Sequence, residues 1–598
     1  MKTKGQESRK TAPASARSAG GARAAGLRSS AKAVRAAEPP RKKYWPYALA
    51  LAGMLIAAFE VYGPSLNGPF LFDDNYLPFS VPNFPLDALR AWLAGVRPLL
   101  MFSYWINYRI SGLETGSYHA FNVLFHAANA VLIFLITLKL LDFAGVERRR
   151  RDILAGFAGA LFLFHPVNSE AVGYVASRSE NLSVLFFFTA FAVFLYRRST
   201  AISWVRAAGV LALFAAAALT KEHTVVLPAL LLLTDYFWNP PFSFQGIRRN
   251  WRLYAPVVIS AAALGMFLLR KLRGAETAGF AIKDLTWYQY FITECRAFWV
   301  YIRLFLFPAG LDIDYDFPIS HSLLEHGAIF GLVAIVAAVA AAFYYRRQYP
   351  LAAYGFFTFL ILMAPTSSFI PIKDPVAERR LYLSMIGLLL ITLECLRRVD
   401  VRQPKWMAAM AAVLLLAAIA TNRRNVVWTD AVVLWEDTVA KSPGNARAHF
   451  QLAQAYYDRG DYAKALPQYE KVAQLQKPDD RLFIDWGLAY DQLNQPDQAL
   501  TKLKQAAAMN PTAHVYSQIG MVYGKQGRNA EALEALARAE QFNPNFEMTY
   551  VYRGGVRQNM GDLQGAIKDF RQGLAINPNN QRAAQALVNA EAILRSRP

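Results

Sequence analysis

The sequence predicts an all-α protein in two parts: a polytopic membrane domain with about eleven transmembrane helices, followed by an α-solenoid. Three observations predict this fold class. The chain has 598 residues and is 55% hydrophobic, which is too apolar for one soluble domain and too long for one membrane anchor. Apolar runs long enough to cross about 30 Å of hydrocarbon recur up to residue 420. A repeat with a period of about 34 residues begins at residue 446.

Residues 1–43 form a basic tail with twelve Lys or Arg and two acidic residues. Its Ala, Ser and Gly content predicts disorder. The tail ends in Arg41-Lys42-Lys43 with no small-residue cleavage site after it, which predicts an uncleaved signal anchor and a cytosolic N-terminus. The net charge of +21 lies mainly in this tail and between the apolar runs, so we expect no nucleic-acid partner. We predict no structural disulfide between Cys295 and Cys395.

Residues 44–422 form the predicted membrane domain. The eleven expected spans are 46–63, 118–141, 153–164, 182–196, 205–219, 224–237, 254–269, 327–345, 351–364, 381–395 and 406–420. This arrangement places the basic clusters at 148–151, 197–198, 248–252, 346–347 and 397–405 in the cytosol. We expect interfacial helices within 84–112 and a membrane-skimming helix at 285–307, although the charges in the latter leave a crossing open. An odd number of crossings places the C-terminal part outside the cytosol.

The C-terminal part shows a repeating pattern of small and aromatic residues. Trp486-Gly487-x-x-Tyr490 recurs at 520–523 and 554–557, and a small residue recurs at 465, 499, 532 and 566. This is the tetratricopeptide pattern, in which small residues let two antiparallel helices approach closely. We predict a lead-in helix at 430–440 within a linker of residues 423–445. Four repeats and a capping helix then fill 446–598. Such a solenoid binds an acceptor peptide or merely holds a partner.

Two adjacent carboxylates, Asp73 and Asp74, directly follow the first expected span. Ionised groups beside hydrocarbon are costly unless they are paired or used, so the pair is a candidate functional site. The stretch also fits an ordinary turn in a surface loop, because Asp-Asp-Asn is favourable turn sequence. The residues around the pair leave both interpretations open.

Further polar residues fall at the outer ends of the expected spans. His119, Asn122 and His126 have the i, i+3, i+7 spacing of one helix face. The other polar residues at these outer ends are His165, Glu170, Arg178, Lys221, Glu222, Arg379 and Arg380. A lone histidine at a helix end is usually structural, but this many polar residues on one side of a membrane predict a shared cavity.

These residue types suit the transfer of a group from a lipid phosphate. A polyprenyl phosphate leaving group needs charge stabilisation by Arg or Lys more than it needs a general acid. An acceptor hydroxyl needs a base, for which Asp is suitable. Asp73 and Asp74 with His119 or His126 could hold Mg²⁺ or Mn²⁺, but no ligand spacing requires a metal, so none is predicted.

Seven motifs occur in order along the chain. They are Phe72-Asp73-Asp74, Arg97-Pro98-Leu99, Tyr118-His119-x-x-Asn122-x-x-x-His126, His165-Pro166-x-x-x-Glu170-Ala171-Val172, Arg178, Lys221-Glu222 and Ala377-Glu378-Arg379-Arg380-Leu381-Tyr382-Leu383. From residue 46 to the end, the chain resembles the TMTC-type proteins. These are membrane glycosyltransferases of the GT-C fold with C-terminal tetratricopeptide repeats. The resemblance implies a polyprenyl-phosphate mannose donor, O-mannosylation of protein Ser or Thr, and inversion at the anomeric carbon.

The resemblance also implies roles for individual residues. Asp73 or Asp74 would be the base. Arg379 or Arg380 would contact the donor phosphate, with Lys221 and Arg97 as weaker candidates. The residues that would shape the pocket are His119, His126, His165, Glu170, Arg178 and Glu222. The short repeat array and the Ala/Arg-rich tail depart from the animal proteins and suggest a bacterial relative in the inner membrane, with its repeats in the periplasm. The sugar and the acceptor therefore stay open.

Two other functions compete with a glycosyltransferase. The first is a non-enzymatic membrane scaffold whose repeats gather proteins for envelope assembly. The second is a transporter or a flippase for lipid-linked sugars, which would need ionisable groups near the middle of the membrane, where the sequence has few.

Overall fold

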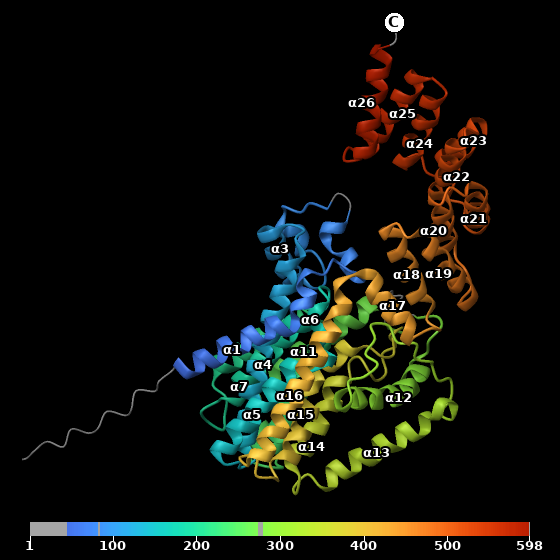
Figure 1. Ribbon diagram of the computed structural model, residues 1–598. Helices are drawn as coiled ribbons and strands as arrows, with labels where there is room; N and C mark the ends of the chain where they lie inside the picture. The colour runs from blue at the N-terminus through green and yellow to red at the C-terminus, as the bar shows by residue number, and fades with distance from the viewer. Residues whose placement is uncertain (1–44, 82–83, 273–278, 281, 597–598) are drawn as a thin grey trace, which may run out of the picture. The chain divides into compact units, whose positions relative to one another are not determined.

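The computed structural model describes residues 45–81, 84–272, 279–280 and 282–596 (Figure 1). Within these ranges every secondary-structure element is a helix. The predicted basic tail at 1–43 lies outside them. The chain divides into two compact units, 1–51 and 52–598. The described part of the first unit is the beginning of α1 (Trp45–Tyr62), so the site and the repeats belong to the second unit.

Each expected span lies on a helix. The helices of this part are α1, α2 (Leu89–Trp92), α3 (Pro98–Ser111), α4 (Thr115–Phe143), α5 (Arg148–Phe164), α6 (Ser169–Gly173), α7 (Arg178–Leu195), α8 (Trp204–Ala218), α9 (Leu227–Trp238), α10 (Gln245–Arg249), α11 (Trp251–Leu272), α12 (Trp287–Leu306), α13 (Ala328–Tyr344), α14 (Pro350–Met363), α15 (Leu381–Leu396) and α16 (Pro404–Asn425). Short 3-10 turns, among them η2 (Phe72–Tyr76), η5 (Glu222–Val226) and η7 (Glu378–Arg380), connect some of them.

Five segments of the described chain are long and apolar enough to cross a membrane. They are Leu49–Asn67, Thr115–Phe143, Arg178–Leu195, Glu325–Tyr344 and Pro404–Thr429. Three further apolar helices, α8, α14 and the Trp251–Phe267 part of α11, are shorter. On α13, Phe330 and Val336 expose 77% and 60% of their surface, as expected of a side that faces lipid. Five spans are fewer than the eleven expected, so that number stays a prediction, as does the membrane-skimming position of α12.

Two short helices owe their close packing to glycine. A Cβ atom added to Gly355 on α14 would lie 2.5 Å from the carbonyl oxygen of Gly387 on α15, and the reverse distance is also 2.5 Å. Close backbone approach through small residues is typical of helices packed within membranes. It helps to bury α15 along almost all of its length.

The basic clusters meet at one end of the helices. Arg150 donates hydrogen bonds of 2.6 Å to the carbonyl oxygens of Arg397 and Val399. Arg398 donates to the carbonyl oxygen of Gln348 at 3.0 Å. These contacts agree with the prediction that the clusters 148–151 and 397–405 share one side. Which side of a membrane this is stays a prediction.

The C-terminal part is a row of antiparallel helix pairs. Its helices are α17 (Ala431–Lys441), α18 (Ala446–Arg459), α19 (Tyr462–Leu475), α20 (Asp480–Gln492), α21 (Pro496–Met509), α22 (Ala513–Lys525), α23 (Asn529–Phe542), α24 (Glu547–Asn559), α25 (Leu563–Ile576) and α26 (Gln581–Ser596). A Cβ atom added to Gly520 would lie 2.5 Å from Leu536 Cγ. The small residue of the repeat is therefore required by helix contact, as the sequence pattern predicts.

The beginning of this row contacts the loop that carries the two aspartates. Trp435 on α17 meets the ring of Phe72 edge to face, with centroids 5.4 Å apart. Trp428 stacks on Tyr174 at 5.6 Å. The repeats and Asp73 thus lie at the same end of the helices, while the odd number of crossings stays a prediction.

Candidate active site

The acid loop, residues 71–76, gives its two aspartates different surroundings. Asp74 is buried, and its carboxylate accepts backbone hydrogen bonds from Leu71 (2.9 Å) and Ala176 (2.6 Å). Burial raises the pKa of Asp74 to about 8, and the two N–H donors oppose this shift. Asp73 is exposed, and its carboxylate makes no hydrogen bond or ion pair with any described residue. Asp74 therefore fastens the loop, whereas Asp73 is open to a ligand.

Tyr174 holds the backbone at Asp73. The Asp73 N–H donates to the Tyr174 hydroxyl at 2.7 Å. Burial raises the pKa of Tyr174 well above its ordinary value; the charges of Asp74 and Asp73 raise it further, and Arg379 opposes them. The phenol therefore stays protonated, and it lies within electrostatic reach of both Asp73 and Arg379.

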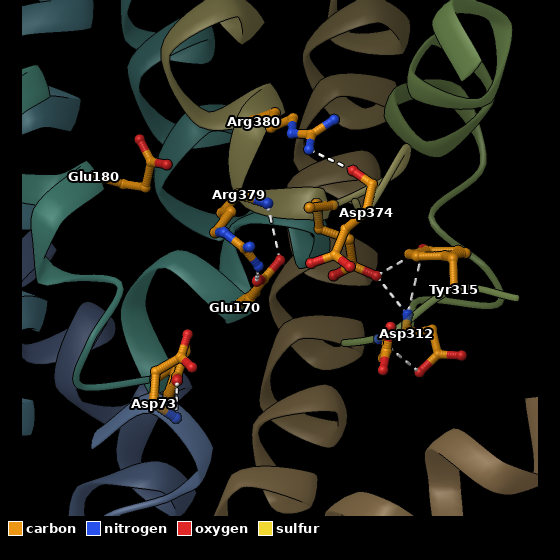
Figure 2. Close-up of polar contacts among 12 residues, drawn as sticks. Asp73, Glu170, Glu180, Asp312, Tyr315, Asp374, Arg379 and Arg380 are labelled. Atoms are coloured by element: carbon orange, nitrogen blue, oxygen red, sulfur yellow. Dashed lines mark hydrogen bonds and ion pairs between the residues drawn. The ribbon is translucent and has the colours of Figure 1, made fainter. Parts of the chain in front are cut away.

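Glu170 and Arg379 form a close ion pair beside this loop (Figure 2). Glu170, on α6, is buried and accepts from the Arg379 guanidinium at 2.5 Å and from its backbone N–H at 2.9 Å. The Arg379 side chain keeps 29% of its surface exposed. Burial alone would lower the pKa of Arg379, but Glu170 raises it above its ordinary value. Arg379 is therefore a fixed cation with an accessible side.

Lys221 is a second paired cation. It donates to the buried Glu180 carboxylate and to Ser179 Oγ (3.3 Å), and His223 Nε2 lies 3.4 Å from the other Glu180 oxygen. Burial lowers the pKa of Lys221, Glu180 opposes this effect, and the charges of Arg97 and Arg379 add to it. Arg97 and Arg379 are thus each close enough to Lys221 to oppose its positive charge.

Arg97 is the third. It precedes α3 and binds Glu222 through two parallel hydrogen bonds of 2.9 and 2.8 Å. The two side chains are 37% and 31% exposed. Each of the three cations therefore has its own carboxylate. Such a cluster can bind an anionic group when the carboxylates yield some of the N–H donors.

Arg380 is buried and turned away from this cluster. It donates to the carbonyl oxygens of Asp374 and Pro375, the latter at 2.7 Å, and lies 3.6 Å from Glu294 on α12. These contacts fix the loop before α15. Of the two adjacent arginines, Arg379 is the one whose surroundings suit a ligand.

The three histidines are buried and join backbone segments. His119 donates to the carbonyl oxygen of Gly68 (3.1 Å), His126 to that of Leu163 (3.0 Å) and His165 to that of Phe305 (2.9 Å). Their contacts support the surrounding helices. No group of three or more His, Cys, Asp or Glu side chains in the described chain is arranged to hold a metal ion.

Arg178 is fully buried and makes no ion pair with a described residue, although the Asp74 carboxylate is within electrostatic reach of it. It donates to Asn122 (3.0 Å), Asn107 (2.5 Å) and the carbonyl oxygen of Tyr118 (2.8 Å), and its guanidinium lies 4.5 Å from the Tyr104 ring centroid. These contacts join α3, α4 and α7 behind the acid loop.

Several residues near this cluster were absent from the predicted site. Glu180 follows Arg178 in the same polar stretch, so its position was a usable signal. Asp312 belongs to an acidic run, and its backbone N–H donates to Glu378 at 2.5 Å. No pattern in the sequence marks Tyr174 or Asp374, because their partners lie on distant segments.

Comparison with known proteins identifies relatives of both parts. A tetratricopeptide repeat family model matches residues 428–481 and 484–545, and so includes α17. Protein O-mannosyl-transferase TMTC3 of Mus musculus is 22% identical over 550 residues, covering 81% of this chain and 57% of the relative. TMTC3 of Homo sapiens is 23% identical, with 81% and 58% covered. The chain thus spans a little over half the length of these relatives.

Two more comparisons are with a nematode protein and a solved structure. Protein O-mannosyl-transferase F38B6.6 of Caenorhabditis elegans is 23% identical over 61% of this chain and 51% of its own length. The repeat protein YrrB is 21% identical, with a TM-score of 0.23 over 30% of this chain and 88% of its own. The chain is homologous to the TMTC-type protein O-mannosyl-transferases, and its C-terminal part is a tetratricopeptide repeat region.

Proposed function

We propose that this protein is a membrane glycosyltransferase that moves mannose or another hexose from a polyprenyl-phosphate donor to an acceptor hydroxyl, with Asp73 as the base. The observation that carries the proposal is the difference in surroundings between Asp73 and Asp74. Both carboxylate oxygens of Asp74 accept hydrogen bonds from backbone N–H groups, whereas the exposed Asp73 carboxylate is accessible to a ligand. The names of the relatives support a mannosyltransferase.

The donor phosphate would bind between Arg379, Lys221 and Arg97. All three are cations held in place by carboxylates, and Arg379 and Arg97 are partly exposed. A phosphate oxygen would accept N–H donors that now pair with Glu170, Glu180 or Glu222. These cations stabilise the negative charge that develops on the phosphate as its bond to the anomeric carbon breaks. They therefore favour departure of the polyprenyl phosphate.

The reaction is a single displacement. The acceptor oxygen forms a bond to the anomeric carbon, and the bond from that carbon to the phosphate oxygen breaks with its electron pair leaving on the polyprenyl phosphate. Asp73 takes the proton of the acceptor hydroxyl, which the attacking oxygen must lose. Attack from the face opposite the phosphate inverts the anomeric centre.

The acceptor would be a protein Ser or Thr presented by the repeats. Their first helices contact Phe72, so a peptide bound to the repeat domain has a short path to Asp73. The proposed location is a bacterial inner membrane, with eleven crossings, the N-terminus in the cytosol and the repeats in the periplasm. Cysteine accessibility at each helix end would test the crossings.

Asp73→Asn and Asp74→Asn provide the test. We expect Asp73→Asn to lower the transfer rate by roughly 10²-fold or more, since a positioned base contributes about that much. Purified variants would be assayed with polyprenyl-phosphate mannose and an acceptor peptide, with and without EDTA to decide whether Mg²⁺ or Mn²⁺ takes part. Asp74→Asn should mainly lower the unfolding temperature.

Full activity in Asp73→Asn would exclude Asp73 as the base. If the wild-type protein transfers no sugar from any polyprenyl-phosphate donor, while changes in the repeats still abolish partner binding, the protein is a scaffold instead.

A further inference from the structure

Arg447, at the beginning of α18 in the first repeat, contacts three separate segments that precede it in the chain. Its guanidinium donates to both carboxylate oxygens of Asp314 at 2.6 and 2.5 Å and to Asp374 at 2.8 Å. It also lies 5.9 Å from the ring centroid of Phe72. Phe72 directly precedes Asp73, and Asp374 lies five residues before Arg379. One side chain of the repeat domain therefore contacts both loops of the candidate site.

Phe72 has a conformation that its surroundings must maintain. Its φ is +47°, a value that a bulky side chain rarely adopts. Such a conformation persists only where neighbouring groups hold it. Here Trp435 meets the Phe72 ring edge to face, and the Arg447 guanidinium lies 5.9 Å from the centroid of the same ring. Because Asp73 is the next residue, the direction of its carboxylate depends on how firmly Phe72 is held.

Asp374 connects Arg447 to the arginine pair. Its carboxylate accepts from Arg447, and its carbonyl oxygen accepts from Arg380. Arg380 is fixed in turn by Pro375 and Glu294. Figure 2 shows Asp374 beside Arg380, next to the Glu170–Arg379 pair. A shift of Asp374 would therefore be passed to the short turn that carries Arg379.

We propose that Arg447 is a positioning residue for the transfer, which keeps the base loop and the phosphate-binding turn in register. The proposal rests on the function proposed above. Arginine suits the task because its planar, forked guanidinium can bind one carboxylate through two parallel hydrogen bonds and still reach a second one. A lysine ammonium can keep one of these contacts but cannot reproduce the fork.

Docking of the repeat domain does not depend on Arg447 alone. Ser442 donates to Asp312 at 2.8 Å, Lys441 to the carbonyl oxygen of Leu311 at 2.7 Å, and Asn445 to that of Asp314 at 3.0 Å. These bonds remain when Arg447 is replaced. The loss of Arg447 is therefore expected to loosen the two loops and leave the repeat domain in place.

The chain offers a matched control. Arg481 occupies the equivalent position one repeat later, 34 residues further on. Its guanidinium lies 5.0 Å from the ring centroid of Phe450 and its Nε lies 3.9 Å from Asp485, so these contacts stay within the repeats. Arg481→Ala removes the same side chain from the same kind of helix without touching either loop.

The experiment compares the full-length wild type with Arg447→Ala, Arg447→Lys and Arg481→Ala. Steady-state kinetics with polyprenyl-phosphate mannose would be measured together with the unfolding temperature. Hydrogen exchange would be followed in peptides covering residues 70–77 and 374–381. We expect Arg447→Ala to lower kcat about tenfold or more, because small displacements of reacting groups have effects of this size. Its donor KM should change less than about threefold, since Lys221 and Arg97 are left intact.

Arg447→Lys should be intermediate, and Arg481→Ala should match the wild type in kcat. Exchange should become faster in both loops of Arg447→Ala and in neither loop of Arg481→Ala. Equal kcat values for the two alanine variants, or unchanged exchange in the two loops, would overturn the proposal. If Arg447→Ala does not fold, Arg447→Lys is compared in the same way. If the wild type shows no transfer, the proposed function fails, and the exchange data still decide whether Arg447 orders both loops.

Discussion

Arg150 and Arg379, at opposite ends of the helical domain, bind different kinds of group. At the end with the basic clusters, Arg150 donates to the backbone carbonyl oxygens of Arg397 and Val399, whereas Arg397 and Arg398 themselves pair with the Glu394 carboxylate. At the end with the acid loop, Arg97, Lys221 and Arg379 donate to side-chain carboxylates. The Arg397 and Val399 carbonyl oxygens belong to the segment directly after α15, so the Arg150 guanidinium fastens α5 to that segment.

An anionic ligand can replace a carboxylate as the partner of an arginine or lysine, whereas a backbone carbonyl oxygen is fixed in the chain. Two arginines with similar numbers of hydrogen bonds can therefore have different uses. Arg150 joins α5 to the segment after α15. Under the proposed function, Arg97, Lys221 and Arg379 bind the donor phosphate. Two pairs of variants, Arg379→Gln with Arg150→Gln and Arg97→Gln with Glu222→Gln, test this distinction.

The largest expected difference is between Arg379→Gln and Arg150→Gln. We expect Arg379→Gln to lower the transfer rate about 100-fold, as loss of a preorganised charge at the reacting group does. Arg150→Gln should leave the rate nearly unchanged and lower the free energy of unfolding by about 2 kcal/mol, because hydrogen bonds from a charged donor are lost. Activity assays and denaturant unfolding would measure both.

Arg379→Gln also leaves the Glu170 carboxylate buried without its partner, which is itself destabilising. The double variant Glu170→Gln with Arg379→Gln removes that charge and serves as the control. Its stability should recover while its activity stays low. If activity recovers together with stability, Arg379 has only a structural role.

A smaller effect is expected at the exposed pair. Arg97→Gln should raise the donor KM about tenfold, equivalent to the loss of one charge-assisted hydrogen bond to phosphate. Glu222→Gln keeps the cation and should change the donor KM less than about threefold. Titration of the donor lipid at fixed acceptor separates the two. Equal KM values for both variants would show that Arg97 does not contact the donor.

The smallest effect concerns the pH dependence of stability. Burial raises the pKa of Glu378 to about 8, and the Arg424 guanidinium opposes this shift. Between its ordinary value of 4.5 and about 8, the folded protein holds a proton that the unfolded chain has released. This contribution to stability is therefore greatest in acid and is lost as the pH rises toward 8.

Glu378→Gln should reduce the fall in unfolding temperature between roughly pH 5.5 and pH 8, an effect of a few degrees. Some dependence should remain, since Asp74 is shifted in the same direction. An unchanged slope in Glu378→Gln would contradict the assignment.

Local patterns predict the helices of this protein well. Every expected span lies on a helix, and Gly520 is packed as the repeat pattern requires. The period and the hydropathy of a segment indicate its own secondary structure. They do not show which apolar helices are covered by protein and which face lipid, so α5, α9 and α15 are helices without being confirmed spans.

The site was predictable only down to neighbouring pairs. Sequence alone does not distinguish Asp73 from Asp74 or Arg379 from Arg380, because the difference comes from partners far along the chain. Ala176 fastens Asp74, and Glu294 fixes Arg380. The histidines predicted for the pocket donate to backbone carbonyl oxygens of other segments, and sequence alone does not show these partners. Arg447 and Arg481 occupy the same position in successive repeats, and their different contacts come from the segments that lie opposite them.

The contact between Phe72 and Trp435 has a consequence for how the protein is made. The two residues are far apart in the chain, and the membrane helices emerge from the ribosome before α17 does. A nascent chain that ends after α16 has every apolar helix but lacks the aromatic ring against which the acid loop packs. Domains generally fold in the order of synthesis. The loop of Asp73 therefore reaches its final form late in biogenesis, once the first repeat has folded against it.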